Sequence, residues 1–309
     1  MISYHLDTGV RPVICEPRPD AATLTLMSEP KVIVLRTAGT NCDQETVHAW
    51  ELAGAKPERV HVRELIENPS RLDSFAILTI PGGFSYGDDI SAGKILAGQM
   101  IHHLSDALNR FVAAGKLVLG ICNGFQVLVK AGLLPGPLTN TTSHTNTSNT
   151  PTGGPSNTGG LTAHADRQAV TLTHNDSAKF EDRWVCLKSS RAANAFVPAE
   201  TILEMPIAHG EGKLVARDAA VRQLLTSANR VAFTYCSLDG KPGPYPINPN
   251  GSDDDIAGLF DTTGRVLGLM PHPERFVHPT QHPLWTRRSS DNAADGRVIF
   301  ETAIQHAKG

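Results

Sequence analysis

Short apolar runs alternate with helical patterns over the first half of the chain. The runs are rich in Val, Ile and Leu and are typical of strands buried on both faces of a sheet; they span 31–36, 59–65, 75–80 and 116–121. Between them, residues 43–53 and a stretch that begins near residue 97 and ends at Gly115 carry apolar side chains at helical spacing. Strands that alternate with helices in this way predict an α/β fold with a parallel sheet covered on both faces.

Two segments break this pattern. Residues 1–30 are polar and rich in proline, without periodicity, and Met27 is an alternative start of the chain. Residues 139–160 contain only Thr, Asn, Ser, Gly, Pro and one His, so they cannot offset the entropy of ordering themselves. We therefore expect a flexible extension over 1–30 and a single domain over 31–309, interrupted by a low-complexity insert at about 138–169. Strand-like runs return after the insert, at 183–187, 231–235 and 266–270.

Composition narrows the class of protein. Of the 309 residues, 40% are hydrophobic, and 28 Lys+Arg stand against 31 Asp+Glu, for a formal net charge of −3. The apolar content excludes wholesale disorder, and the balanced charge argues against an electrostatic nucleic-acid binder. Apolar runs fall short of the ~18 residues that a membrane span needs, and the first thirty residues lack a secretory signal. We expect a cytoplasmic protein that binds neither nucleic acid nor membrane.

The five cysteines argue against disulfides and structural zinc. They are Cys15, Cys42, Cys122, Cys186 and Cys236. Their number is odd, they are widely spaced and they form no C-x-x-C pair. A reducing compartment suits such a set. We expect one of them to be a nucleophile and the other four to be bystanders.

The candidate nucleophile lies in Gly120-Ile-Cys122-Asn-Gly124, between a predicted strand and a predicted helix. A cysteine at such a turn resembles the serine of a nucleophile elbow. Glycines on either side allow a sharp, strained turn, and the N-terminus of the following helix favours the thiolate. The alternative is a buried cysteine in a tight turn.

A candidate base follows the run 266–270, in Pro271-His272-Pro-Glu274. His272 can accept the thiol proton and pass it to a leaving group, while Glu274 fixes the tautomer and stabilises the imidazolium. Two residues apart in an extended loop, both side chains point to the same side. The alternative is an ordinary loop histidine, in a chain that has 13 of them.

A candidate oxyanion hole follows the run 75–80. Gly82 and Gly83 allow backbone N–H groups to approach a ligand, and the N–H of Asn123, directly after the candidate nucleophile, supplies the second donor. A glycine-rich turn or a phosphate-binding loop is the alternative, but the phosphate-binding lysine pattern is missing. All three motifs follow strands, so a parallel sheet places them at one edge.

Together these residues resemble the class I glutamine amidotransferases, and more closely the family of glutaminase subunits of phosphoribosylformylglycinamidine synthase. The resemblance covers about 31–135 and 171–285. It is carried by 81–89, 120–126 and 267–275, which contain the three motifs, and by 37–43, 174–177, 206–212 and 248–252. It implies a flavodoxin-like, doubly wound, mostly parallel sheet with helices on both faces.

The resemblance also implies roles for individual residues. Cys122 attacks the carboxamide of L-glutamine, His272 acts as general base and acid, and Glu274 orients His272. Gln126, His209 and Glu211 are expected to help hold the glutamine, although a buried structural His–Glu pair would also explain the last two.

The same family passes the released ammonia to a synthetase subunit (PurL). That partner uses ATP and magnesium to make formylglycinamidine ribonucleotide in purine biosynthesis; whether a small subunit (PurS) bridges the complex stays open. We expect this chain itself to bind no cofactor and no metal. Three alternatives remain, namely a class I glutaminase that serves another synthetase, a non-catalytic scaffold of the same fold, and a cysteine peptidase or other hydrolase.

Overall fold

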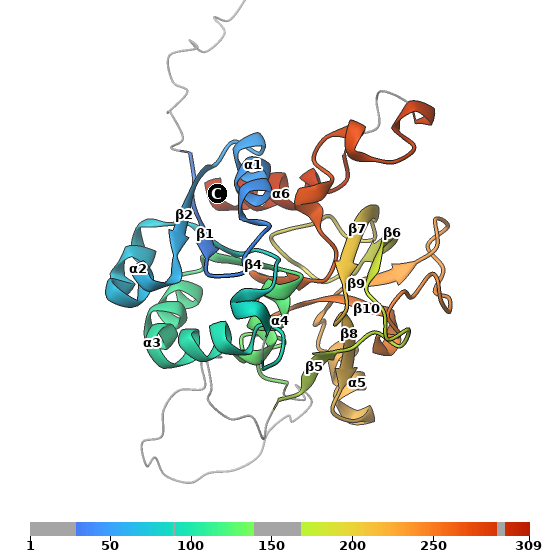
Figure 1. Cartoon of the computed structure of the whole chain (residues 1–309), viewed down its shortest axis with the longest axis horizontal. Helices are drawn as coiled ribbons and strands as arrows, with labels where there is room; N and C mark the ends of the chain where they lie inside the picture. Colours follow the sequence, from blue (N-terminus) through green and yellow to red (C-terminus); the bar gives the residue numbers. More distant parts are fainter. Residues whose placement is uncertain (1–28, 89, 139–167, 289–293) are drawn as a thin grey trace, which may run out of the picture.

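The computed structural model describes residues 29–88, 90–138, 168–288 and 294–309 (Figure 1). Its centre is a nine-stranded sheet in the order β2-β1-β3-β4-β11-β10-β9-β6-β7, accompanied by a small sheet of β5 and β8. The strands are β1 (Lys31–Arg36), β2 (Lys56–His61), β3 (Ile77–Ile80), β4 (Leu117–Ile121), β5 (Val170–Thr173), β6 (Glu181–Ser189), β7 (Ile202–His209), β8 (Lys213–Ala216), β9 (Val231–Cys236), β10 (Ile256–Phe260) and β11 (Val266–Leu269).

The helices follow the predicted alternation in the first half of the chain. The α-helices are α1 (Asp43–Leu52), α2 (Val62–Glu67), α3 (Lys94–Ala113), α4 (Asn123–Lys130), α5 (Ala219–Ser227) and α6 (Arg297–Lys308). Short 3-10 helices are η2 (Pro69–Ser74), η3 (Ser85–Asp88), η5 (Asp253–Asp255), η6 (Pro273–Arg275), η7 (Pro279–Gln281) and η8 (Trp285–Arg287).

The strands are parallel in one half of the sheet and antiparallel in the other half. The four pairings from β2 to β11 are parallel, and the four from β11 to β7 are antiparallel. The α/β class is confirmed, and the strands β3, β4 and β11 are buried on both faces, as their apolar runs predict. The sheet as a whole is mixed, with its parallel part in the half that carries the predicted site.

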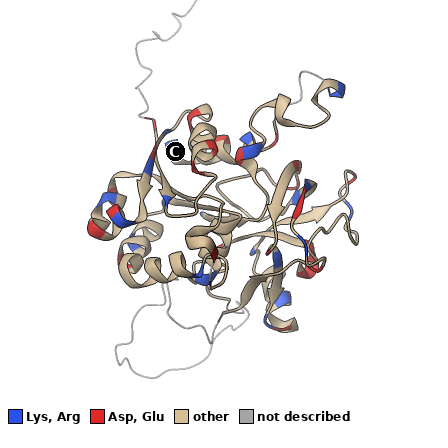
Figure 2. Cartoon of the chain, viewed as in Figure 1, with Lys and Arg blue, Asp and Glu red and all other residues tan. Residues whose placement is uncertain are grey.

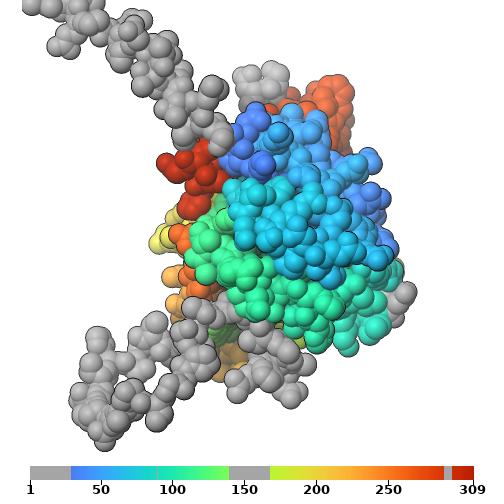
Figure 3. Space-filling view, turned by 90° about the vertical axis from the view of Figure 1, so that its left-hand side faces the viewer, coloured from blue at the N-terminus to red at the C-terminus, as the bar shows by residue number. Residues whose placement is uncertain are grey.

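Helices cover both faces of the parallel strands, as predicted. Figure 1 shows α1 and α6 on one side and α3 and α4 on the other. Trp50 of α1 packs edge-on against Phe300 of α6, with ring centroids 4.9 Å apart, and its Nε1 donates to Oγ1 of Thr79 on β3 at 2.9 Å. A buried indole N–H needs such a partner, so this bond fixes α1 over the sheet. Figure 3 shows the end of α6, in red, at the surface beside the blue N-terminal elements.

One predicted strand is partly wrong. Residues 59–65 were expected to be extended throughout, but the chain turns into α2 after His61. The His61 ring accepts a hydrogen bond from the N–H of Arg63, and the carboxylate of Glu64 accepts one from the N–H of His61. This reciprocal capping starts a helix, on which Val62 and Leu65, three positions apart, are both buried.

Several predicted features lie outside the described residues. These are the extension over 1–30 apart from its last two residues, the alternative start at Met27, and nearly all of the insert at 138–169. None of the described helices combines the length and apolarity needed to cross a bilayer. Figure 2 shows acidic and basic residues interspersed over the fold, and some pair one helical turn apart, as Arg63 and Glu67 do on α2.

Candidate active site

The predicted elbow is formed at the end of β4. Cys122 lies between β4 and α4 with a φ of +50°, a strained conformation for a residue with a side chain. A Cβ atom at Gly120 would lie 2.7 Å from the carbonyl oxygen of Gly124, and one at Gly124 would lie 1.9 Å from that of Ile80. Both positions therefore exclude any side chain, which explains the glycines that flank the cysteine.

His272 and Glu274 form a buried couple after β11. Nδ1 of His272 lies 2.6 Å from Oε1 of Glu274, and both residues are 1% exposed. The N–H of His272 donates to the carbonyl oxygen of Pro206 at 2.8 Å, which fixes the loop against β7. Burial acts to lower the pKa of His272, but the Glu274 carboxylate and the nearby Cys122 outweigh it, so this pKa lies well above its usual 6.5.

Gly82 brings the three motifs together. A Cβ atom there would lie 2.8 Å from Cε1 of His272, 3.1 Å from Sγ of Cys42 and 3.4 Å from Cβ of Cys122. The register agrees, because Gly120 of β4 pairs with Ile80 of β3 on one side and with Gly268 of β11 on the other. The carboxyl ends of three neighbouring parallel strands thus meet at one edge.

Two backbone amides are available beside the elbow. Within the described part of the chain, the N–H groups of Gly83 and Asn123 have no hydrogen-bond acceptor. The side chain of Asn123 is fully engaged elsewhere. Its Oδ1 accepts from the hydroxyl of Ser85 at 2.6 Å, and its Nδ2 donates to Asp88 at 3.1 Å and to Gln126 at 3.0 Å. These bonds hold the first turn of α4 against η3, with its amide left for a ligand.

A second thiol lies at the site, against expectation. Cys42 was predicted to be a bystander, yet its Sγ donates to Oδ1 of Asn41 at 3.1 Å and accepts from Nη2 of Arg275, also at 3.1 Å. Burial raises the pKa of the Cys42 thiol, and His272 and Arg275 oppose this only in part. Cys42 lies at the start of α1, in the segment 37–43 of the family resemblance, which was the available signal; its contact with Arg275 arises only when that helix packs beside the loop after β11.

The ligand atoms of Cys42, His272 and Glu274 lie within 4.8 Å of one another, close enough to bind one metal ion. Two observations favour another role. Glu274 is already paired with Nδ1 of His272, and the guanidinium of Arg275 contacts the Cys42 sulfur, where it would repel a cation. The arrangement suits an oriented imidazole better than a metal cage.

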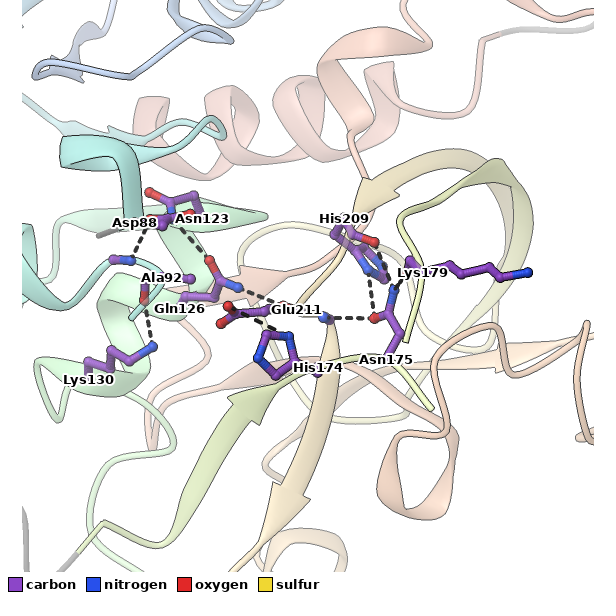
Figure 4. Close-up of polar contacts among 12 residues, drawn as sticks. Asp88, Ala92, Asn123, Gln126, Lys130, His174, Asn175, Lys179, His209 and Glu211 are labelled. Atoms are coloured by element: carbon purple, nitrogen blue, oxygen red, sulfur yellow. Dashed lines mark hydrogen bonds and ion pairs between the residues drawn. The ribbon is translucent and has the colours of Figure 1, made fainter. Parts of the chain in front are cut away.

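A pocket of about 470 Å³ opens in front of these residues. Cys122 and His272 line it, as do the predicted binding residues Gln126, His209 and Glu211. Figure 4 shows Gln126 reaching from α4 to the loop after β7, where its Nε2 donates to the carbonyl oxygen of Glu211 at 2.6 Å. The size and the few convergent polar groups are those of a small-molecule site.

The back wall of the pocket depends on a residue that the sequence did not single out. Asn175 is 3% exposed, and its side chain makes four hydrogen bonds, which include both sides of the turn from His209 to Gly212 (Figure 4). A Cβ atom at Gly212 would lie 2.2 Å from Cε1 of His209, so only glycine fits beside the ring. Asn175 belongs to the segment 174–177, and its position in the family resemblance was the available signal.

All of the predicted site residues line this pocket or directly adjoin a residue that does, and so do Cys42, Asp88, Asn175 and Arg275. Cys122, His272 and Glu274 are arranged as a nucleophile, an imidazole and its carboxylate partner. Such an arrangement can attack a carbonyl carbon and protonate the group that leaves.

Comparison with known proteins agrees with this chemistry. The model of the CobB/CobQ-like glutamine amidotransferase domain matches residues 29–307. A PurQ subunit of phosphoribosylformylglycinamidine synthase from Dehalococcoides mccartyi is 43% identical over 284 residues, which cover 91% of this chain and 99% of the relative. The PurQ subunit of Archaeoglobus fulgidus is 37% identical over 294 residues, with 90% and 97% covered.

A solved structure also shows similarity to the same family. A chain of the PurLQS structure from Thermotoga maritima aligns with a TM-score of 0.61 and 28% identity, over 90% of this chain and 99% of that one. The match spans nearly the whole relative in each case. The chain therefore belongs to the CobB/CobQ-like glutamine amidotransferase family and, within it, to the PurQ subunits of phosphoribosylformylglycinamidine synthase.

Proposed function

We propose that this chain hydrolyses L-glutamine with Cys122 as nucleophile, His272 as general base and acid, and Glu274 as the group that orients His272. One observation carries the proposal. A histidine–carboxylate couple with a 2.6 Å contact is buried near a cysteine held in a strained elbow, and the histidine and the cysteine both lie against Gly82. A structural cysteine needs neither the strain nor the couple.

The geometry supports a two-step reaction. The Cys122 sulfur attacks the carboxamide carbon, and the negative charge that develops on the oxygen is held by the N–H groups from the Gly82–Gly83 turn and of Asn123. Protonated His272 gives its proton to the nitrogen, so that ammonia leaves and a γ-glutamyl thioester remains. Water, deprotonated by His272, then hydrolyses the thioester to glutamate and restores the thiol.

The remaining pocket suits the amino-acid end of glutamine. Gln126 and Glu211 line it, and Asp88 adds a second carboxylate near Glu211. Carboxylates at this end would attract the α-ammonium group of the substrate. The pairing of Gln126 with Glu211 is what keeps these groups in place.

We further propose that the ammonia passes to a synthetase subunit (PurL) and that a small subunit (PurS) joins the complex. The names of the relatives and of the Thermotoga maritima complex support this. Phe84 and Phe180 line the pocket while 48% and 54% exposed, an apolar rim that a partner would cover. ATP and magnesium would act in the synthetase, which makes formylglycinamidine ribonucleotide for purine biosynthesis, and this subunit would bind no cofactor.

The test is glutamate release from L-glutamine, with and without the synthetase subunit. We expect release that the partner stimulates, and a loss of roughly 10⁴-fold or more in Cys122→Ala. Cys186→Ala is the matched control, because Cys186 lies on β6 outside the pocket lining. Full activity of Cys122→Ala would contradict the proposed nucleophile. Capture of a different synthetase from cell extract would show that the ammonia serves another acceptor.

A further inference from the structure

The position of the proton on the His209 ring follows from its neighbours. Nδ2 of Asn175 donates to the carbonyl oxygens of Lys179, at 2.9 Å, and of His209, at 2.8 Å. Its Oδ1 accepts from the N–H of Gly212 at 3.0 Å. Because carbonyls only accept and an amide N–H only donates, the orientation of the Asn175 side chain is fixed.

This orientation leaves one tautomer for His209. Nδ1 lies 3.2 Å from Oδ1 of Asn175, an oxygen without hydrogen, so Nδ1 must carry the ring proton and donate it. Nε2 is then a bare lone pair. Among the described residues it has no hydrogen-bond partner, although His209 is only 3% exposed. A buried polar atom without a partner is costly and points to a ligand.

His209 also stays uncharged. Burial, reinforced by the nearby charge of His272, lowers the pKa of His209 to about 3. Of the charged groups around the ring, His272 is the one that bears on this pKa. Across the physiological range, His209 can accept a hydrogen bond through Nε2 but has no proton there to donate.

The ring lies close to the reacting atoms. His209 lines the same pocket as Cys122 and His272, and Sγ of Cys122 lies 3.8 Å from the carbonyl oxygen of Ala208, the preceding residue. Gly212 leaves room for the ring, since any side chain there would displace it. The contact of Nδ1 with Oδ1 of Asn175, at 3.2 Å, keeps the ring in this position.

We propose that His209 selects glutamine by accepting a hydrogen bond from the carboxamide nitrogen through Nε2, in the tautomer that Asn175 imposes. This inference rests on the proposed glutaminase activity and specifies how its site distinguishes substrate from product. The NH₂ group of glutamine supplies the hydrogen that the lone pair needs, whereas the carboxylate of glutamate brings only lone pairs and is repelled. Released ammonia can be held in the same way without gaining a proton from His209.

The first experiment separates selection from structural support. In His209→Leu, we expect kcat/KM for glutamine to fall roughly tenfold or more, and inhibition by glutamate to become stronger. His209→Gln, which can present an oxygen acceptor, should recover part of the selectivity. His103→Leu is the control, because His103 is exposed on α3. The proposal would be overturned if, in both His209 variants, kcat/KM for glutamine and the affinity for glutamate as an inhibitor fell by the same factor.

The second experiment does not need activity. In protein labelled with ¹⁵N-histidine, long-range proton–nitrogen correlation spectra report which ring nitrogen carries the proton, and His209→Gln assigns the signal. We expect the Nδ1–H tautomer from pH 5.5 to 8.5 without titration. A proton on Nε2, or a titration near pH 6.5, would overturn the inference even in a fully active enzyme. If the wild type releases no glutamate with its partner, the proposed function fails instead.

Discussion

Gln126 donates from Nε2 to the carbonyl oxygen of Glu211, and this 2.6 Å bond joins the helix that begins after Cys122 to the loop that follows β7. The helix directly follows the proposed nucleophile, and the loop lines the same pocket. Two parts of the pocket lining are therefore joined by a contact between a side chain and a backbone carbonyl.

Removal of this bond should weaken substrate binding. In Gln126→Leu, we expect the KM for glutamine to rise by roughly tenfold while kcat falls less, because the carbonyl of Glu211 loses its donor and the loop shifts. Steady-state glutamate release measures both constants. A selective loss of kcat would show instead that Gln126 acts on the reacting atoms.

Loss of charge at Glu274 should disable the proposed base. Glu274→Gln keeps the shape of the side chain but removes the carboxylate that raises the pKa of His272. We expect kcat to fall about 10²–10⁴-fold and the limb of the pH–rate profile that belongs to His272 to move to lower pH. Glu301→Gln is the control, since the partner of Glu301 among the described residues is Arg297, also on α6. An unchanged profile would contradict the orienting role.

A single methyl group at Gly82 should displace the imidazole. In Gly82→Ala, the new Cβ would lie 2.8 Å from Cε1 of His272, so the ring must move and glutaminase activity should drop by at least about tenfold. Gly98→Ala is the matched control, because, among the described residues outside the backbone of its own helix, no atom lies within 4 Å of a Cβ there. Because Gly98 lies within helix α3, this change should raise the free energy of unfolding by about 0.5–1 kcal/mol and leave glutaminase activity intact. Thermal melting and glutamate release compare the two variants.

Thiol labelling should distinguish the two cysteines of the site. Cys42 donates its proton to Asn41, and burial raises the pKa of its thiol, so iodoacetamide should react with it slowly. We expect peptide mass spectrometry to locate the first label on Cys122, and excess glutamine to slow that reaction. Labelling of Cys42 before Cys122 would reverse the assignment.

The buried neutral His209 should make the protein sensitive to acid. Its pKa is about 3 when folded and about 6.5 when unfolded, so the unfolded chain binds an extra proton between these values. The contribution of His209 to the free energy of unfolding is therefore complete above pH 6.5 and is lost as the pH falls towards 3. Between pH 7 and pH 5, we expect the free energy of unfolding of the wild type to fall about 2 kcal/mol more than that of His209→Leu. Urea unfolding followed by circular dichroism measures the difference.

Local sequence carries much of the fold and of the site. Strands such as β3 and β4 are predictable because burial on both faces requires an unbroken apolar run. The elbow is predictable because Gly120 and Gly124 meet backbone atoms at distances that no side chain permits. His272 and Glu274 are two residues apart, so their pairing needs no long-range information.

Other features depend on contacts between distant segments. Cys42 and Arg275 are 233 positions apart, and their contact arises only when α1 packs beside the loop after β11. The tautomer of His209 is set by Asn175, 34 positions away. The helix after His61 follows from capping by side chains, which a strand-like pattern of apolar residues conceals.

The pairing of β4 with β11 has a consequence for the timing of folding. It joins residues 118–121 to residues 266–269, so the cysteine is synthesised about 150 residues before its histidine. Chains fold from the N-terminus as they are made, and contacts so distant in sequence form late. A nascent chain therefore carries the proposed nucleophile without the proposed base until β11 and η6 emerge, and we expect truncated products not to hydrolyse glutamine. Completion of the sheet is the step that switches the enzyme on.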